Sequence, residues 1–253
     1  MIARAMLAGK PWDAFDAGMD ADACFVHPHH PDRLGIPEPR PGRVRADRMR
    51  SALAWNVFRT LAPIDPSRWL RPLHARVFGF DQRYVAPQWL DVRVWAAVPA
   101  AGGAGAAGCV DVLCTSGDAV WAFLTTFERD VIVTAADAST DDPIVRTVAA
   151  AARLAGRRRC FVGLLSSGTQ SAAIGERLVR RYAAAPARLR DRLPSDLAAA
   201  DIGGLGLGTW GTCATVLAGC AASPAIGDPE RESARRCLRW LSSCGIAPDG
   251  LIA

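Results

Sequence analysis

The chain has 253 residues, of which 50% are hydrophobic and 22% are charged. This balance excludes a largely disordered chain, and the length is sufficient for one large domain or two small ones. The formal net charge of +5 is mildly basic and comes almost entirely from arginine, since Lys10 is the one lysine. Net charge alone therefore favours a nucleic-acid partner only weakly.

The beginning of the chain and its cysteines predict a cytoplasmic protein. The sequence does not open with a long apolar stretch followed by small residues, as a secretion signal would. No uncharged apolar run reaches the ~18 residues that a membrane helix needs, so we expect no membrane partner. The eight cysteines include no CxxC pair, which favours reduced, buried thiols over disulfides.

Residues 1–42 are predicted to form an N-terminal arm, acidic in its first half and rich in proline in its second half. The second half contains His27, His29 and His30, which are side chains of a type that binds metals. Structural zinc sites take their ligands from separated segments, so we interpret this stretch as a solvated loop. The remaining residues, 43–253, are predicted to form a single α/β domain.

The first predicted helix covers Arg43–Ala62. Its apolar residues Leu53, Val57 and Leu61 recur at four-residue spacing, as expected for a helix with one buried face. Arginines crowd the beginning of this helix, at positions 40, 43, 45, 48 and 50. They either contact phosphate groups at the helix N-terminus or form a solvated basic face, and the sequence leaves both interpretations open.

A group of strands follows. Alternating side chains predict a strand over Asp91–Val98, and a Gly- and Ala-rich loop continues to Gly108. Residues 110–131 predict a hairpin, because two apolar runs flank the turn sequence Ser-Gly-Asp at 116–118. A helix beginning at Pro143 then leads to the apolar run Cys160–Leu165, which predicts a right-handed βαβ unit.

The final third of the sequence predicts mostly helices, and a helix over Gln170–Ala185 is expected on the face opposite the crossover helix. The glycines between Gly203 and Gly208 suggest a phosphate-binding loop, but the segment before them also has a helical pattern. A dinucleotide-binding loop follows a strand. We therefore expect these glycines to allow close packing between helices.

The hairpin of residues 110–131 resembles the core of the PD-(D/E)XK nuclease-like superfamily, the restriction-endonuclease fold. In this resemblance Asp111 matches the Asp of the family, Leu124 its Glu and Thr126 its Lys. The resemblance extends to the helix before the strands and to the helix and strand after them. It implies an α/β fold with an αβββαβ core, a central mixed sheet flanked by helices and extra C-terminal helices.

Leu124 has no metal-binding oxygen in its side chain, and Thr126 has no positive charge. The resemblance therefore implies a catalytically degenerate, nuclease-like protein that is not an enzyme, has no cofactor and binds nucleic acid, such as DNA, or a protein partner. Nucleic-acid contacts are then expected from the first helix, through Arg43, Arg45, Arg48 and Arg59.

Two alternatives remain open. In the first, the protein is an active nuclease dependent on Mg²⁺ or Mn²⁺, whose site has migrated to Asp111 and Glu128, with Asp111 as a metal ligand. An arginine such as Arg129 or Arg59 would then replace the missing lysine, although arginine relays protons poorly because it stays charged. In the second, the chain is an unrelated α/β interaction protein.

Overall fold

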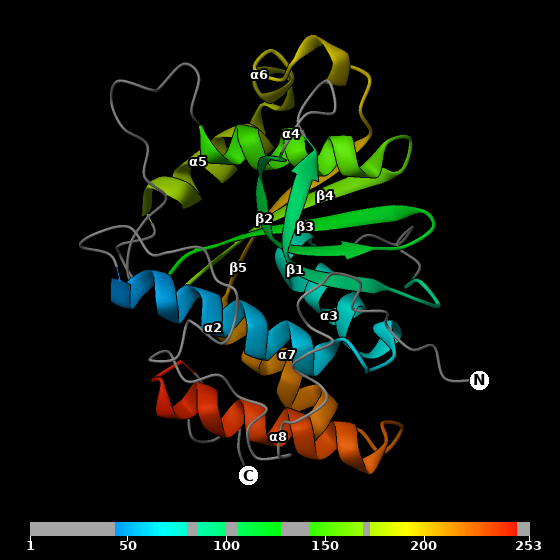
Figure 1. Ribbon diagram of the computed structural model, residues 1–253, viewed down its shortest axis with the longest axis vertical. Coiled ribbons are helices and arrows are strands. Elements are labelled where there is room, and N and C mark those ends of the chain that lie inside the picture. Colours follow the sequence, from blue (N-terminus) through cyan, green and yellow to red (C-terminus); the bar gives the residue numbers. More distant parts are fainter. Residues whose placement is uncertain (1–43, 80–85, 100–105, 128–141, 169–172, 247–253) are drawn as a thin grey trace.

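The computed structural model describes residues 44–79, 86–99, 106–127, 142–168 and 173–246. These residues form an α/β fold, in which helices pack on both faces of a mixed sheet (Figure 1). The predicted N-terminal arm, residues 1–42 with its histidines, lies outside the described residues. Within these residues, no helix combines the length and the apolar character needed to cross a bilayer.

The sheet has five strands in the order β1-β2-β3-β4-β5. The first three strands are antiparallel neighbours, whereas β4 runs parallel to β3 and β5 runs parallel to β4. The predicted hairpin is confirmed, and the Oγ atom of Ser116 accepts hydrogen bonds from the amides of Asp118 and Ala119 in its turn. The strand bounds are β1 (Asp91–Pro99), β2 (Ala106–Thr115), β3 (Ala119–Thr125), β4 (Arg159–Ser166) and β5 (Ile202–Thr209).

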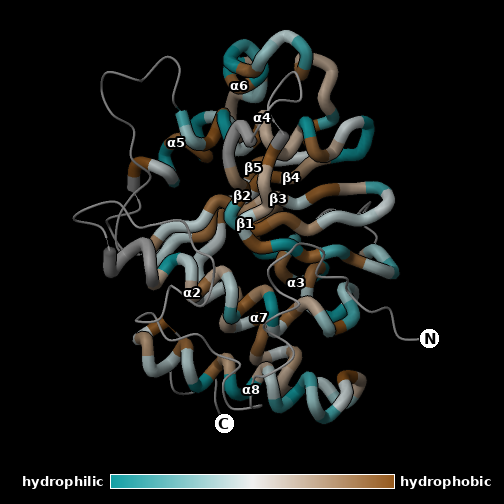
Figure 2. Tube along the Cα trace, viewed as in Figure 1, coloured by the Kyte–Doolittle hydropathy of each residue, from teal (hydrophilic) through white to brown (hydrophobic). Residues whose placement is uncertain are grey.

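One face of the sheet is covered by α2 (Val44–Leu61), α3 (Pro66–Phe78) and α7 (Trp210–Ala222). Helix α8 (Asp228–Ser243) packs outside this layer, against α2 and α7 (Figure 1). The large side chains of this first core come from both the sheet and the helices, and hydrophobic residues concentrate along the central strands (Figure 2). Its fully buried aromatic residues include Phe58, Trp69, Trp121, Phe123 and Trp210.

The opposite face is covered by α4 (Pro143–Ala155), α5 (Ala173–Ala184), α6 (Pro186–Arg190) and the short 3₁₀ helix η5 (Ser195–Leu197). The prediction that α4 and α5 lie on different faces is wrong, because Val179 and Tyr182 of α5 share the second core with Ile144 and Val148 of α4. The strand order explains this arrangement. Two successive crossovers between parallel strands, from β3 to β4 and from β4 to β5, advance in the same direction; crossovers of this kind are almost always right-handed, and two of the same hand place their helices on one face.

The glycine-rich segment is a strand, and the prediction of a loop between helices is wrong. Strand β5 extends the parallel part of the sheet, and α7 begins directly after it at Trp210. The glycines are needed for close packing against α3, since a Cβ atom on Gly206 would lie 2.4 Å from the backbone oxygen of Val77. Close packing was correctly predicted, but its partners are a strand and a helix.

Candidate functional site

Asp111 lies where the antiparallel ladder between β2 and β3 ends. The last pair of that ladder joins Val112 to Phe123, so Asp111 and Leu124 are the next positions along the two strands. The resemblance expects the two acidic residues of a nuclease site at these two positions. The backbones of the two matched positions are therefore neighbours, but their side chains diverge: Asp111 is turned to Thr125 and to Arg50 of α2, whereas Leu124 packs against the core on the opposite side of the sheet.

The carboxylate of Asp111 is held by three groups that all contact the same oxygen. Oδ2 accepts a hydrogen bond of 2.7 Å from the backbone amide of Thr125 and one of 2.9 Å from the Thr125 hydroxyl. The guanidinium of Arg50, on α2, lies 3.8 Å from this oxygen. The side chain of Asp111 is 12% exposed and that of Arg50 is 36% exposed, so the ion pair is open to solvent mainly on its arginine side.

The backbone is irregular beside Asp111. In the ladder between β1 and β2, Val94 pairs with Val112 and Ala96 with Val110, so Trp95 is opposite Asp111 without a ladder pair of its own. Trp95 has a φ of 54°, and it is the one non-glycine residue with positive φ in the described parts of the chain. Such a conformation costs free energy in a bulky residue and is often found at functional sites.

Strands β1 and β2 both change faces at this irregularity. In β1, Val94 belongs to the first core but Ala96 to the second, and in β2 the same change separates Val112 from Val110. Residues two positions apart normally share a face of a strand. The change of face occurs at Asp111, whose backbone has no ladder pair on β1 and whose carboxylate accepts a hydrogen bond from the backbone amide of Thr125.

The cation beside Asp111 was not among the predicted site residues. Arg50 lies three residues before Leu53 and seven before Val57, on the face of α2 that is buried against the sheet. A charged residue at the end of a buried helical stripe needs an opposite charge nearby. This spacing could have singled out Arg50 among the arginines that crowd the beginning of the helix.

Cys109 lies two residues before Asp111 on β2. Although Cys109 is an exposed residue, desolvation of its thiol by neighbouring groups, together with the negative charge of Asp111, raises the pKa of Cys109 to about 12, and the opposing effect of Arg50 is smaller. The thiol is therefore protonated at neutral pH. Because the thiolate is the nucleophilic form of cysteine, Cys109 is poorly suited to nucleophilic catalysis.

The two other positions of the family motif are neutral and packed. Leu124 is half-buried and contacts the second core, on the side of the sheet covered by α4 and α5. Thr126 is 7% exposed; its amide donates to the backbone oxygen of Leu165, and its own backbone oxygen accepts from Nε1 of Trp210. Neither residue supplies a charge or a free carboxylate beside Asp111.

The remaining predicted site residues do not meet at Asp111 in the described structure. Glu128 and Arg43 lie outside the described residues, and for Arg45 and Arg48 the structure gives only their place in the first turns of α2. Arg59 lies over the ring of Trp55, with its guanidinium carbon 5.2 Å from the ring centroid. Trp55 in turn stacks on Trp95, so Arg59 belongs to an aromatic contact of α2 with β1.

A search of the described residues finds no group of three or more histidine, cysteine, aspartate or glutamate side chains placed to hold a metal ion. The chain matches no protein-family model, and comparison with curated proteins and with solved structures also gives no match. The geometry around Asp111 therefore carries the functional argument.

Proposed function

We propose that this protein is a catalytically degenerate, nuclease-like protein that binds nucleic acid without cutting it. The order of elements supports a relation to the PD-(D/E)XK nuclease-like fold: a leading helix, three antiparallel strands, a crossover helix and a parallel strand. In this order of elements, Leu124 and Thr126 stand where the nuclease-like fold has a Glu and a Lys. The chain would then have the backbone framework of a nuclease site but would lack two of its charged side chains.

The observation that carries the proposal is the position of Arg50. A metal-dependent phosphodiesterase uses carboxylate oxygens to hold a divalent cation beside the attacked phosphate. Here a guanidinium lies 3.8 Å from Oδ2 of Asp111, and the same oxygen already accepts two hydrogen bonds from Thr125. Arg50 thus supplies the positive charge at this carboxylate. A divalent ion would have to displace the guanidinium, because two positive charges at a similar distance from each other repel by about 4 kcal/mol per unit charge.

An arginine in this position suits binding better than catalysis. A guanidinium presents several N–H donors that match phosphate oxygens, and it is poorly suited to relaying protons. Arg50 is also the fifth arginine of a series that begins at residue 40, and its guanidinium is 36% exposed, so it can be reached from solvent. These features favour a phosphate-bearing ligand.

The proposal is tested by titrating fluorescent oligonucleotides with the full chain at several salt concentrations, in EDTA and in Mg²⁺. We expect binding in both solutions and an affinity that falls steeply with salt, because phosphate contacts release counterions. Arg50→Gln should weaken binding and lower the salt slope. Binding that requires Mg²⁺ would favour the migrated site at Asp111 and Glu128, and no salt-dependent binding would point to a protein partner.

Rebuilding the motif tests the relation to the nuclease-like fold. The variant Arg50→Gln, Leu124→Glu, Thr126→Lys removes the competing cation and supplies the two missing groups. We expect it to bind Mn²⁺ in a calorimetric titration that leaves the wild type silent, and Arg50→Gln alone serves as the matched control. A folded triple variant without any heat of Mn²⁺ binding would contradict the assignment of Leu124 and Thr126 to the motif.

A further inference from the structure

Helix α5 presents an outward face that combines arginines with apolar side chains. Its inward residues Val179 and Tyr182 are buried in the second core. On the outward side the protein has an open hollow of about 590 Å³, and Ile174 on its lining is 41% exposed, although most large hydrophobic residues of the fold are buried. Among the residues that the structure describes, those that line this hollow lie on α5, and Leu178 among them also packs against the second core: Ile174, Arg177, Leu178, Arg180 and Arg181.

The charge of this face is strongly positive. Between residues 173 and 190 the sequence has one acidic residue, Glu176, and five arginines. Glu176 is already engaged, because it lies 3.4 Å from Arg180 and 3.5 Å from the hydroxyl of Ser166. Arg177 and Arg181 are exposed one helical turn apart, and α6 adds the exposed Arg188 and Arg190.

This face begins at the end of the sheet that also carries Asp111. Glu176 contacts Ser166 at the last residue of β4, and Thr125 at the last residue of β3 pairs with Leu165. Thr125 also holds the Asp111 carboxylate. In Figure 1, α2 and α5 lie on opposite faces of the sheet, and both begin at its left-hand end in this view.

We propose that the outward face of α5 binds single-stranded nucleic acid, with the phosphates on Arg177 and Arg181 and the bases against Ile174 and Leu178. The inference rests on the proposed function and names its ligand and contact surface. A row of arginines alone would suit any polyanion. The apolar side chains of Ile174 and Leu178 favour a single strand over a duplex. The bases of a single strand have exposed apolar faces, whereas a duplex hides these faces in its stack.

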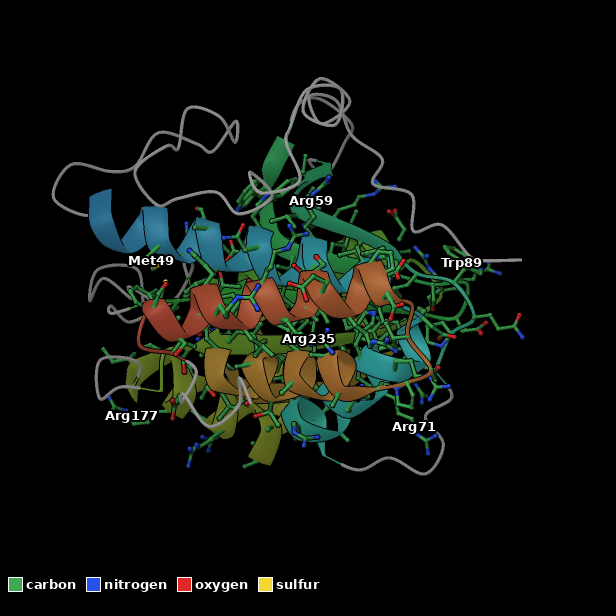
Figure 3. All side chains as sticks on the ribbon, turned by 90° about the horizontal axis from the view of Figure 1, so that it is seen from below. Met49, Arg59, Arg71, Trp89, Arg177 and Arg235 are labelled. Atoms are coloured by element: carbon green, nitrogen blue, oxygen red, sulfur yellow. The ribbon has the colours of Figure 1, made fainter. Side chains whose placement is uncertain are left out.

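The test compares binding of a labelled single strand with binding of the duplex of the same length and sequence by the full chain. Arg177→Ala with Arg181→Ala removes two cations from α5. The matched control, Arg68→Ala with Arg71→Ala, removes two exposed arginines from α3; Figure 3 shows Arg71 and Arg177 at opposite sides of the molecule. Both double variants are first compared with the wild type by thermal unfolding, since neither pair is buried.

We expect the wild type to prefer the single strand. The α5 variant should lower the slope of log K against log salt by about 1.4, from two lost phosphate contacts at ~0.7 each, and the α3 variant should leave it unchanged. Ile174→Ser should reduce the preference for the single strand without changing the salt slope.

Three results would overturn the inference. Equal slopes for the two double variants would remove α5 from the contact while leaving nucleic-acid binding intact. A preference for the duplex would exclude contact between the bases and the side chains of Ile174 and Leu178. If the wild type binds no nucleic acid at all, the proposed function fails as well, and direct binding of an acidic peptide that is weakened by Arg177→Ala with Arg181→Ala would then indicate a protein ligand.

Discussion

Asp111 is the residue on which the functional argument depends, and its hydrogen bonds make a stability prediction. Its carboxylate accepts from both the amide and the hydroxyl of Thr125. Asp111→Ala leaves that amide without its partner at a mostly buried position, so we expect the free energy of unfolding in urea to fall by about 1–3 kcal/mol.

Thr125→Val is the matched control for this prediction. It removes only the hydroxyl contact and keeps the amide donor, so its expected loss is smaller, about 0.5–1.5 kcal/mol. Equal stability of the Asp111→Ala variant and the wild type would show that the carboxylate does not hold the strand end.

Of the three residues that meet at this candidate site, the sequence singled out Asp111 and missed Arg50 and Thr125. Asp111 was identified because a lone acid opens an apolar strand in a pattern with a family resemblance. Arg50 and Thr125 were missed because their roles arise from packing: the contact requires the particular distance between α2 and the end of β3. Glu128 lies outside the described residues, and its assignment stays a prediction.

At the scale of elements, the glycines of β5 provide a test with an internal control. Gly206→Ala would place a Cβ atom 2.4 Å from the backbone oxygen of Val77, whereas Gly219→Ala, on the exposed side of α7, would meet no atom within 4 Å. We expect the first change to destabilise the protein by about 1–3 kcal/mol through overpacking and the second to stabilise it by up to about 1 kcal/mol through helix propensity. Thermal unfolding of both variants measures this, and shifts of the same sign would contradict the packing of β5 on α3.

The two aspartates that cap α3 and α4 form another matched pair. Asp65 accepts one hydrogen bond from Ser67 and caps α3 at the surface. Asp142 caps α4, is 3% exposed and also accepts from the Tyr182 hydroxyl at 2.6 Å and from Arg192 at 3.1 Å. Asp142 therefore ties the beginning of α4 to α5 and to the segment before η5.

Replacing each aspartate by alanine separates the cap from the network. Asp65→Ala should cost about 1 kcal/mol, as expected for a lost N-cap. Asp142→Ala should cost about 3–5 kcal/mol, because it also removes the acceptor of the buried Tyr182 hydroxyl and the carboxylate that is paired with Arg192, whose guanidinium still donates to the Tyr182 oxygen. Denaturant titration measures both changes, and similar losses would mean that the network adds nothing to the cap.

Local signals and topology differ in what they predict for the elements. The Asp-Pro pair at residues 142–143 correctly predicted the beginning of α4, because capping is decided by neighbouring residues. The strand nature of β5 could not be predicted, since glycine has low strand propensity and is accepted there only because α3 packs closely against it. The face of α5 follows from the strand order, which no local pattern contains.

For the whole molecule, buried thiols predict how stability depends on pH. Burial raises the pKa of Cys213 and of Cys237 from 9.0 to about 12. Between these values the unfolded chain loses protons that the folded chain retains, so stability is complete below pH 9 and falls as the pH rises towards 12. The expected loss is about 1.4 kcal/mol per pH unit for each such thiol.

Urea titrations at pH 8 and pH 10 measure this dependence in the wild type and in Cys213→Ala. The variant is expected to be less stable at pH 8, because it leaves a small cavity, but to lose less stability between the two pH values. A pH dependence identical to that of the wild type would contradict the burial of Cys213 as a neutral thiol.

The central claim is that Arg50 provides the charge that a metal ion would provide in an active enzyme, so that the protein binds strands and leaves them intact. The most direct measurement follows an end-labelled single strand on a denaturing gel after incubation with the full chain and Mg²⁺ or Mn²⁺, at a protein concentration that saturates binding. We predict a strand of unchanged length. Metal-dependent shortening that disappears in Asp111→Asn would contradict the claim.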